Sequence, residues 1–281
     1  MSNAPTRPAL HYHGGKWRLA PWIISHFPPH RVYVEPYGGG ASVLLRKPRS
    51  YAEVYNDLDG EVVNLFRVLR NPLQAAELER LLRLTPFARA EFELSYVVDA
   101  DPVEQARRTL TRSFMGFASA AFRASTTGFR SNTTRSGTTP AMGWKSFPEQ
   151  ISLFTDRLAG VVIETIPALE LLPVHDGAET LFYVDPPYPL STREPGANGN
   201  YRHEMTDDDH CALAATLHTL QGAVVLSGYA CDLYDRELYP DWQRTERETH
   251  GDGAVDRTEV LWLNSAAASL ATLPLFAGAQ Q

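Results

Sequence analysis

The sequence predicts an α/β fold in which an insert of different character divides a parallel sheet into two halves. Alternating strand and helix patterns at both ends of the chain are typical of βαβ units, whose strands run parallel with helices on both faces of the sheet. Residues 105–150 instead interleave aromatic residues with seven Arg or Lys residues against the single acid Glu149, so that seven minus one gives a local charge of +6. We therefore expect a sheet domain formed by both ends of the chain, with a mostly helical and loop-containing basic insert between them.

The same patterns predict where the parts of the chain begin and end. The N-terminal half of the sheet domain spans residues 1–71, of which residues 1–9 are expected to be a disordered leader. The insert spans residues 72–155 and the C-terminal half spans residues 156–265. Residues 266–281, rich in alanine, are expected to form a mobile tail.

In the N-terminal half, a glycine turn separates the first strand from the first helix. Residues 31–45 predict a strand, the turn and a helix start. Residues 50–71 predict a second short strand that ends at Asn56 and Asp57, followed by an amphipathic helix whose apolar residues recur at helical spacing. This strand–helix–strand arrangement predicts the first parallel pair of the sheet.

The remaining elements follow from the same periodicities. Residues 72–104 predict helices rich in Leu, Glu and Arg, and residues 105–150 predict irregular structure. A helix over residues 207–220 is expected to be capped by Asp207 or Asp208. Further strands are expected within residues 159–167, 181–184, 222–229 and 258–264.

The composition and charge exclude several classes of protein. The chain has 281 residues and a formal net charge of −7, so it is not coated in basic surface, and any contact with nucleic acid must be local. Cys211 and Cys231 form no CxxC pair, which argues against a disulfide scaffold or a structural zinc. His203 and His210 flank an acidic helix start, but nothing else there indicates a metal, and we expect none.

The chain carries no sign of export or of membrane insertion. Its N-terminus lacks the apolar segment of a signal peptide. No stretch approaches the ~18 consecutive apolar residues of a membrane span. We expect a cytoplasmic protein that makes no membrane contact, acts as a monomer and has no obligate protein partner.

The turn Gly38-Gly39-Gly40 and a downstream acid indicate an adenosine-type ligand. Glycines after a buried strand let the backbone approach a ligand closely, and the helix that follows offers N–H groups. Asp57 ends the second strand roughly 20 residues beyond the turn, where Rossmann-like sheets place an acid on ribose hydroxyls. The alternative role for Asp57 is a helix N-cap. The glycine turn and the spaced acid together favour an adenosine-type cofactor without phosphates, and residues 13–17 lack the first glycine and the Ser/Thr of a phosphate-binding loop.

The segment Asp185-Pro186-Pro187-Tyr188 directly follows a buried strand and suits chemistry on an aromatic amine. The lone pair of such an amine is delocalised, so the nitrogen is a poor nucleophile. A carboxylate and a backbone carbonyl that accept its two hydrogens would draw the nitrogen towards tetrahedral geometry and stabilise the developing charge. Pro186 fixes its own φ angle and brings no N–H, and Tyr188 offers a ring on which a flat base can stack. The alternative is a strand that simply ends in an acid and prolines.

Five segments of the chain together resemble the Dam-type, class-alpha adenine-N(6) DNA methyltransferases that are common in phages and prophages. The resemblance covers most of the sheet domain and keeps the family's order of cofactor half, recognition insert and catalytic half. One departure is the pair Tyr12-His13, where family members often have Trp-Ala. The matching segments are HYHGGK (11–16), VEPYGGGASVLL (34–45), YNDLDGEVVNLFRVLR (55–70), LFYVDPPY (181–188) and RTEVLWLN (257–264).

The resemblance implies a Rossmann-like methyltransferase fold, S-adenosylmethionine as methyl donor and base flipping in double-stranded DNA. Lys16 would meet the methionine carboxylate, Asp57 would take the ribose hydroxyls, and the catalytic set would be Asp185, Pro186, Pro187 and Tyr188. The residues implied in cofactor binding are Tyr12, Lys16, Glu35, Pro36, Gly38, Gly39, Gly40, Asp57 and Asp185.

The basic insert and the loop after the catalytic strand are the expected DNA-contacting parts. Arginines separated by small polar residues suit phosphates or guanine edges, although a solvated surface loop would have the same composition. The expected DNA contacts are Arg112, Arg123, Arg130, Arg135, Lys145, Arg193 and Tyr201.

Other reactions and one other class of protein are alternatives to DNA adenine methylation. Methylation of cytosine carbon needs a cysteine nucleophile, and the sequence surroundings of Cys211 and Cys231 do not suit one. RNA adenine methylation would use the same chemistry. A non-catalytic nucleic-acid-binding protein with the same fold is a further alternative, which the intact Asp185–Tyr188 segment disfavours.

Overall fold

The computed structural model describes residues 4–117, 127–132, 137–193, 202–250 and 256–271. A seven-stranded sheet with the strand order β3-β2-β1-β4-β5-β7-β6 forms its centre. This mixed sheet, with helices on both sides, confirms the predicted α/β fold. The strands are β1 (Val32–Glu35), β2 (Ala52–Asn56), β3 (Val161–Glu164), β4 (Thr180–Val184), β5 (Ala223–Tyr229), β6 (Gln243–His250) and β7 (Asp256–Leu263).

Strand β1 lies at the point where the strand order reverses. It pairs in parallel with β2 on one side and with β4 on the other. The chain therefore builds β2 and β3 outward in one direction and β4 and β5 in the other, and β7 and β6 add antiparallel strands beyond β5. Open α/β sheets bind ligands outside the carboxyl ends of the strands at such a reversal. The topology thus predicts a ligand site at the carboxyl ends of β1 and β4.

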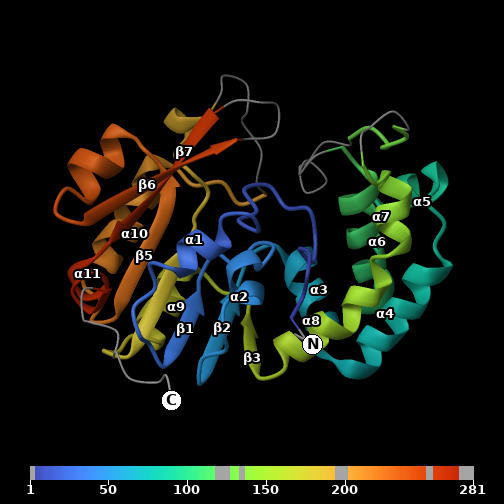
Figure 1. Cartoon of the computed structure of the whole chain (residues 1–281), viewed down its shortest axis with the longest axis horizontal. Coiled ribbons are helices and arrows are strands. Elements are labelled where there is room, and N and C mark those ends of the chain that lie inside the picture. Colours follow the sequence, from blue (N-terminus) through green and yellow to red (C-terminus); the bar gives the residue numbers. More distant parts are fainter. Residues whose placement is uncertain (1–3, 118–126, 133–136, 194–201, 251–255, 272–281) are drawn as a thin grey trace, which may run out of the picture.

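Helices cover both faces of the sheet (Figure 1). The apolar residues of the strands divide between two cores, one on each face, and β4 is buried at all five positions as expected for a strand between two layers. One face packs against α1 (Ala20–Ile24), α2 (Ser42–Arg46), α3 (Gly60–Arg70) and α8 (Ile151–Leu158), and the other against α9 (Ala168–Val174), α10 (Asp207–Leu217) and the π-helical turn η4 (Leu233–Leu238).

The insert forms a group of helices beside α3, away from β5–β7 (Figure 1). Its apolar residues continue the core on the α3 face of the sheet. The helices expected over residues 72–104 are confirmed, but the irregular structure expected over residues 105–150 is wrong where α6, α7 and the short helix η2 form. The insert helices are α4 (Pro72–Leu84), α5 (Arg89–Leu94), α6 (Pro102–Met115), α7 (Pro140–Lys145) and η2 (Pro148–Gln150).

Helix α6 was mistaken for basic surface because its arginines pair with acids outside the basic window. Arg107, Arg108 and Arg112 are all buried, each with less than a tenth of its surface exposed. Burying a guanidinium is costly unless it is paired and hydrogen-bonded, so these side chains tie the insert together. The partners are Glu91 and Glu104 for Arg107, Asp99 and Glu104 for Arg108, and Glu61 of α3 for Arg112.

The described part of the N-terminal leader, residues 4–9, is ordered and crosses the insert. Ala9 is fully buried. The guanidinium of Arg7 donates to the Gly143 carbonyl at 3.1 Å and lies 5.3 Å from the ring centroids of both Phe114 and Phe147. The expectation of a disordered leader is therefore wrong for these residues, because aromatic rings of the insert bind the Arg7 side chain. We call residues 4–11 the N-terminal strap.

Three further elements differ from expectation. Helix α10 is capped by Thr206, not by Asp207 or Asp208, and Thr206 and Asp209 exchange hydrogen bonds in a capping box. Strand β6 was not predicted, because its alternation of charged residues and threonine lacks an apolar face. The expected mobile tail begins with helix α11 (Ser265–Ala271), whose Ala267 is fully buried against the sheet core.

Candidate active site

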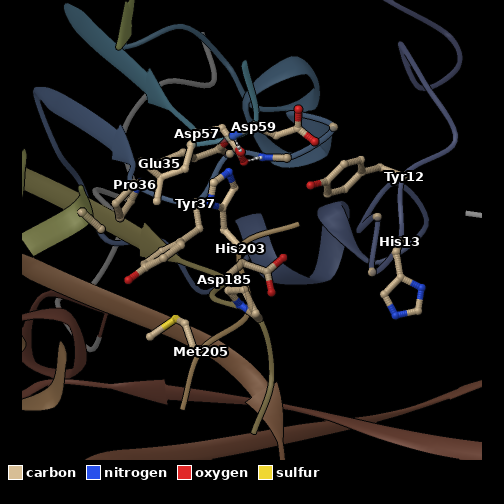
Figure 2. Close-up of a pocket in the computed structure, with 18 of the residues that line it drawn as sticks. Tyr12, His13, Glu35, Pro36, Tyr37, Asp57, Asp59, Asp185, His203 and Met205 are labelled. Atoms are coloured by element: carbon tan, nitrogen blue, oxygen red, sulfur yellow. Dashed lines mark hydrogen bonds between the residues drawn. The ribbon is translucent and has the colours of Figure 1, made fainter. Parts of the chain in front are cut away.

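A cavity of about 270 Å³ opens at the carboxyl ends of β1, β2 and β4. Figure 2 shows side chains from separate parts of the chain around this one hollow. Parallel strands end at the same edge of a sheet, so residues that follow different strands meet there. All nine residues that the sequence implied for a cofactor line the cavity: Tyr12, Lys16, Glu35, Pro36, Gly38, Gly39, Gly40, Asp57 and Asp185.

Glu35 joins the end of β1 to the start of α2. The residue at the N-cap, Ala41, has a left-handed backbone and offers no capping side chain. Glu35 Oε1 instead accepts the Leu44 N–H at 2.7 Å and the Tyr33 hydroxyl at 2.5 Å. Burial raises the pKa of Glu35 to about 7, against the lowering effect of these two hydrogen bonds. Glu35 thus fixes the helix start that borders the cavity.

The glycines of the turn are required by close packing. A Cβ atom on Gly38 would lie 2.2 Å from the ring of Tyr55, and Gly39 has a φ angle of +47°. The Tyr55 hydroxyl donates to the Gly39 carbonyl at 2.8 Å. The turn therefore packs closely against Tyr55 of β2. Its glycines have no side chains, so the backbone is exposed to the cavity.

Asp57 holds the same turn from the end of β2. Its two carboxylate oxygens each accept a backbone N–H at 2.8 Å, one from Gly39 and one from Asp59. Burial raises the pKa of Asp57 to about 6. The N-cap role considered for Asp57 belongs instead to Asp59, which accepts the N–H of Glu61 at the start of α3. Because a carboxylate oxygen has two lone pairs, Asp57 can accept one more donor at each oxygen.

Lys16 connects the N-terminal segment to the residue that follows β4. Its ammonium donates to Asp185 Oδ1 and to the Gly14 carbonyl, each at 2.9 Å. Burial raises the pKa of Asp185 to about 6, although the charge of Lys16 lowers it. The Asp185 carboxylate therefore faces the cavity as a hydrogen-bond acceptor that is ionised at neutral pH.

Tyr188 is buried beneath the cavity and does not line it. Only 7% of the residue is exposed, and its hydroxyl donates to Glu259. The Lys16 ammonium lies 4.8 Å from the centroid of the ring, and the ring of Tyr229 meets it edge-on at 4.7 Å. Pro187 lines the cavity and Pro186 is buried. A base could stack on Tyr188 only after Lys16 or Tyr229 moved.

Part of the cavity wall comes from residues outside the implied cofactor set. Arg202 donates to Asp59 at 3.2 Å and to Glu61 at 2.8 Å, and so ties the segment before α10 to α3. Figure 2 shows His203 and Met205 of this segment beside the cavity. The placement of Tyr37 within the glycine turn was a usable signal, and the segment belongs to the loop over residues 191–205 that we expected to contact DNA, with Arg202 among its contacts. The lining residues outside the implied cofactor set include Tyr37, Asp59, Pro167, Ala168, Leu169, Arg202, His203, Glu204 and Met205.

Two of the expected DNA contacts are buried and paired within the protein. Arg112 is buried in its ion pair with Glu61. Arg193 has a side chain only 7% exposed, which donates to the Tyr188 carbonyl and pairs with Glu204. Both guanidinium groups are paired with acceptors inside the protein.

The other expected DNA contacts are either closer to the surface or not described. Arg130 is half-buried and follows the bridge between Gly116 and Phe129, and Lys145 is exposed at the end of α7. Arg123, Arg135 and Tyr201 lie outside the described residues. Within the described ranges, no group of three or more His, Cys, Asp and Glu side chains could hold a metal ion. In the same ranges, no helix is long and apolar enough to cross a membrane.

The sheet, its reversal at β1 and the acid-containing cavity at the strand ends define an α/β protein with a ligand site at the reversal of strand order. The family model for the D12 class N6 adenine-specific DNA methyltransferases matches residues 12–250, and the chain belongs to this family. It is an enzyme that methylates adenine in DNA. A search of curated proteins found no match to the chain.

Proposed function

We propose that this enzyme transfers a methyl group from S-adenosylmethionine to the 6-amino group of an adenine flipped out of a specific short double-stranded DNA sequence. One observation carries the proposal: Asp185 lines the same cavity as the glycine turn and Asp57. A cofactor held by the turn and by Asp57 would thus lie beside the carboxylate that receives the target amine. No obligate protein partner enters the proposal.

The cavity residues fit an adenosine-type cofactor. Asp57 keeps a lone pair on each oxygen for ribose hydroxyls, and the glycine turn allows close approach of a nucleoside. Tyr12 offers an aromatic surface and Lys16 a cation for a carboxylate at the methionine end. When bound, S-adenosylmethionine supplies an electrophilic methyl group. The proposed cofactor-binding residues are therefore those that line the cavity at the ends of β1 and β2.

Asp185 and the Pro186 carbonyl would accept the two hydrogens of the target amine. This arrangement concentrates the nitrogen lone pair and stabilises positive charge as it develops. Because the pKa of Asp185 is about 6, the carboxylate is ionised at neutral pH and can act as an acceptor. Transfer is direct, without a covalent enzyme intermediate, and the amino proton then leaves to Asp185 or to solvent. Stacking of the base on Tyr188 requires a shift of Lys16 or Tyr229.

The insert over residues 72–155 would recognise the target sequence. Its described helices are held together by buried ion pairs, so recognition falls to exposed groups such as Lys145 and to Arg130. Arg123, Arg135 and Tyr201 remain proposed contacts in segments outside the described residues. Arg112 and Arg193 are no longer part of the proposed DNA-contacting set.

Sequencing that detects N6-methyladenine on plasmid DNA from a methylation-free host expressing the chain tests this proposal. Methylated adenine in one recurring short motif is expected, with none in a host expressing the Asp185→Ala variant. Calorimetry with S-adenosylmethionine on the purified protein tests the cofactor separately. Unmodified DNA from a folded protein that binds the cofactor would refute the proposed reaction.

A further inference from the structure

Tyr188 is held at both ends by charged side chains that lie outside the Asp185–Tyr188 segment. At one end, its hydroxyl donates to Oε1 of Glu259 on β7. At the other, its backbone carbonyl accepts two hydrogen bonds from Arg193, at 3.0 Å from Nε and 2.6 Å from Nη2. Both the ring and the backbone of Tyr188 are therefore held in place by side chains from outside this segment.

Burial of the Glu259 carboxylate costs free energy of desolvation. It is 3% exposed, and its carboxylate is compensated by the Tyr188 hydroxyl, by the Ser227 hydroxyl at 2.6 Å and by the Lys16 ammonium at 3.7 Å. Replacement of a whole buried ion pair by well-packed apolar residues is often neutral or stabilising, so a buried ion pair is weak evidence for a stabilising role. Stability alone is thus a poor reason for the acid. Its two hydroxyl contacts instead set the direction in which the Tyr188 ring points.

Arg193 links the catalytic segment to the cavity wall. Its guanidinium is 7% exposed and spans the Tyr188 carbonyl and Glu204, whose carboxylate lies 2.8 Å away and lines the cavity. A planar guanidinium can hold two groups in fixed directions, whereas a lysine ammonium acts as a point charge. Arg193 therefore couples the position of Asp185-Pro186-Pro187 to the wall formed by the segment before α10.

We infer that Arg193 and Glu259 are positioning residues for methyl transfer, which act by holding Tyr188 and with it the acceptors of the target amine. This inference rests on the proposed function. Acceptors that are fixed in advance need not reorganise during the reaction. A displacement of about 1 Å can lower a rate about 100-fold. The two residues thus affect the chemical step without touching the substrate.

Two conservative variants, Arg193→Lys and Glu259→Gln, test the inference. The readouts are the single-turnover rate of tritiated methyl transfer to duplex DNA that carries the methylated motif, the Kd for S-adenosylmethionine and the midpoint of thermal unfolding. We expect a rate loss of about 10- to 100-fold with the Kd changed less than about threefold and the fold retained. Arg236→Ala, which removes an exposed arginine of η4, is the matched control and should behave as the wild type.

The outcomes separate the inference from the proposed function. Rates within about twofold of the wild type, or rate losses matched by equal losses of cofactor binding and thermal stability, would overturn the inference alone. A folded wild-type chain that transfers no methyl group would overturn the proposed function and this inference with it.

A double-mutant cycle tests whether Glu259 acts through Tyr188. If it does, Glu259→Gln should lower the rate much less in a Tyr188→Phe background, where the hydroxyl is already absent, than in the wild type. Rate losses that multiply independently would show that Glu259 acts by another route and would overturn its assignment. The cycle uses only rates, so a change in overall stability that is common to both variants does not imitate the result.

Discussion

The ammonium of Lys16 lies 2.9 Å from the carboxylate of Asp185, across 169 positions of the chain. The contact brings a charge from the N-terminal half against the carboxylate that ends β4. When a target amine binds to the Asp185 carboxylate, the carboxylate must either keep Lys16 as a second partner or release it. The two residues thus form one electrostatic unit at the junction of the two halves.

The pH dependence of methyl transfer should reflect the ionisation of Asp185 beside Lys16. Because Asp185 acts as an acceptor only when ionised, the rate should fall as the pH drops through about 6. Lys16 lowers the pKa of Asp185, so Lys16→Met should move this acidic limb to higher pH as well as lower the rate. Single-turnover rates between pH 5 and 9 provide the measurement. An acidic limb that does not move would show that another group controls it.

Removing the carboxylate itself should abolish transfer. Asp185→Ala is expected to lower the single-turnover rate by at least about 100-fold, because a preorganised acceptor of developing charge is lost. Cofactor binding should remain mostly intact, because the glycine turn and Asp57 do not depend on Asp185. Methyl transfer into DNA and calorimetry with S-adenosylmethionine separate the two effects. A variant that retained turnover would exclude Asp185 from catalysis.

Glu35 should make the protein less stable at neutral pH than at acidic pH. Its pKa is raised from 4.5 to about 7 in the folded state, so the folded protein binds the proton more tightly than the unfolded chain. Stability gained from this proton is present below pH 4.5 and is lost as the pH rises to 7, by on the order of 3 kcal/mol. Glu35→Gln keeps the size and an acceptor oxygen for Leu44 and Tyr33, and should flatten this dependence. Urea unfolding at pH 5 and pH 8 is the measurement, and equal slopes with pH in both proteins would contradict it.

Arg112 and Lys145 should separate stability from DNA binding. Arg112→Ala removes one of the two arginines that pair with Glu61, the other being Arg202, and leaves the buried Ser95 carbonyl without the Arg112 donor, so it should destabilise the fold by about 1–3 kcal/mol. Lys145→Ala should leave stability unchanged but weaken DNA binding and reduce the slope of log K against log salt by about 0.9, the effect of one phosphate contact. Thermal unfolding and fluorescence anisotropy at several salt concentrations measure the two properties. A Lys145 variant with an unchanged salt slope would remove this residue from the interface.

The sequence was most informative where function and fold require the same residues. The turn at Gly38 and the acid at Asp57 could be placed at one sheet edge because parallel strands share that edge, and the structure brings them together. The segment at Asp185 was marked by its rare composition. Each signal was local and did not depend on distant partners.

What the sequence could not provide was pairing across long distances. Arg112 looked like a DNA contact because Glu61, which neutralises it, lies 51 positions earlier. Arg193 looked like a loop arginine because its bond to the Tyr188 carbonyl depends on the path of the backbone. The role of Glu259 was hidden for the same reason, since its partners come from the segment after β4, from β5 and from the N-terminal segment. Charge counts over a window therefore overestimated the basic surface.

The N-terminal strap changes how the proposed recognition region could be moved between enzymes. Phe114 and Phe147 of the insert are buried partly because Arg7 lies over both rings. The backbone N–H of His11 also donates to Ser113 of α6, at 2.7 Å. A chimaera that exchanged only residues 72–155 would place foreign helices under a strap shaped for other side chains. The transplantable module is therefore discontinuous, and a specificity graft would have to carry residues 4–11 together with the helices that they cover.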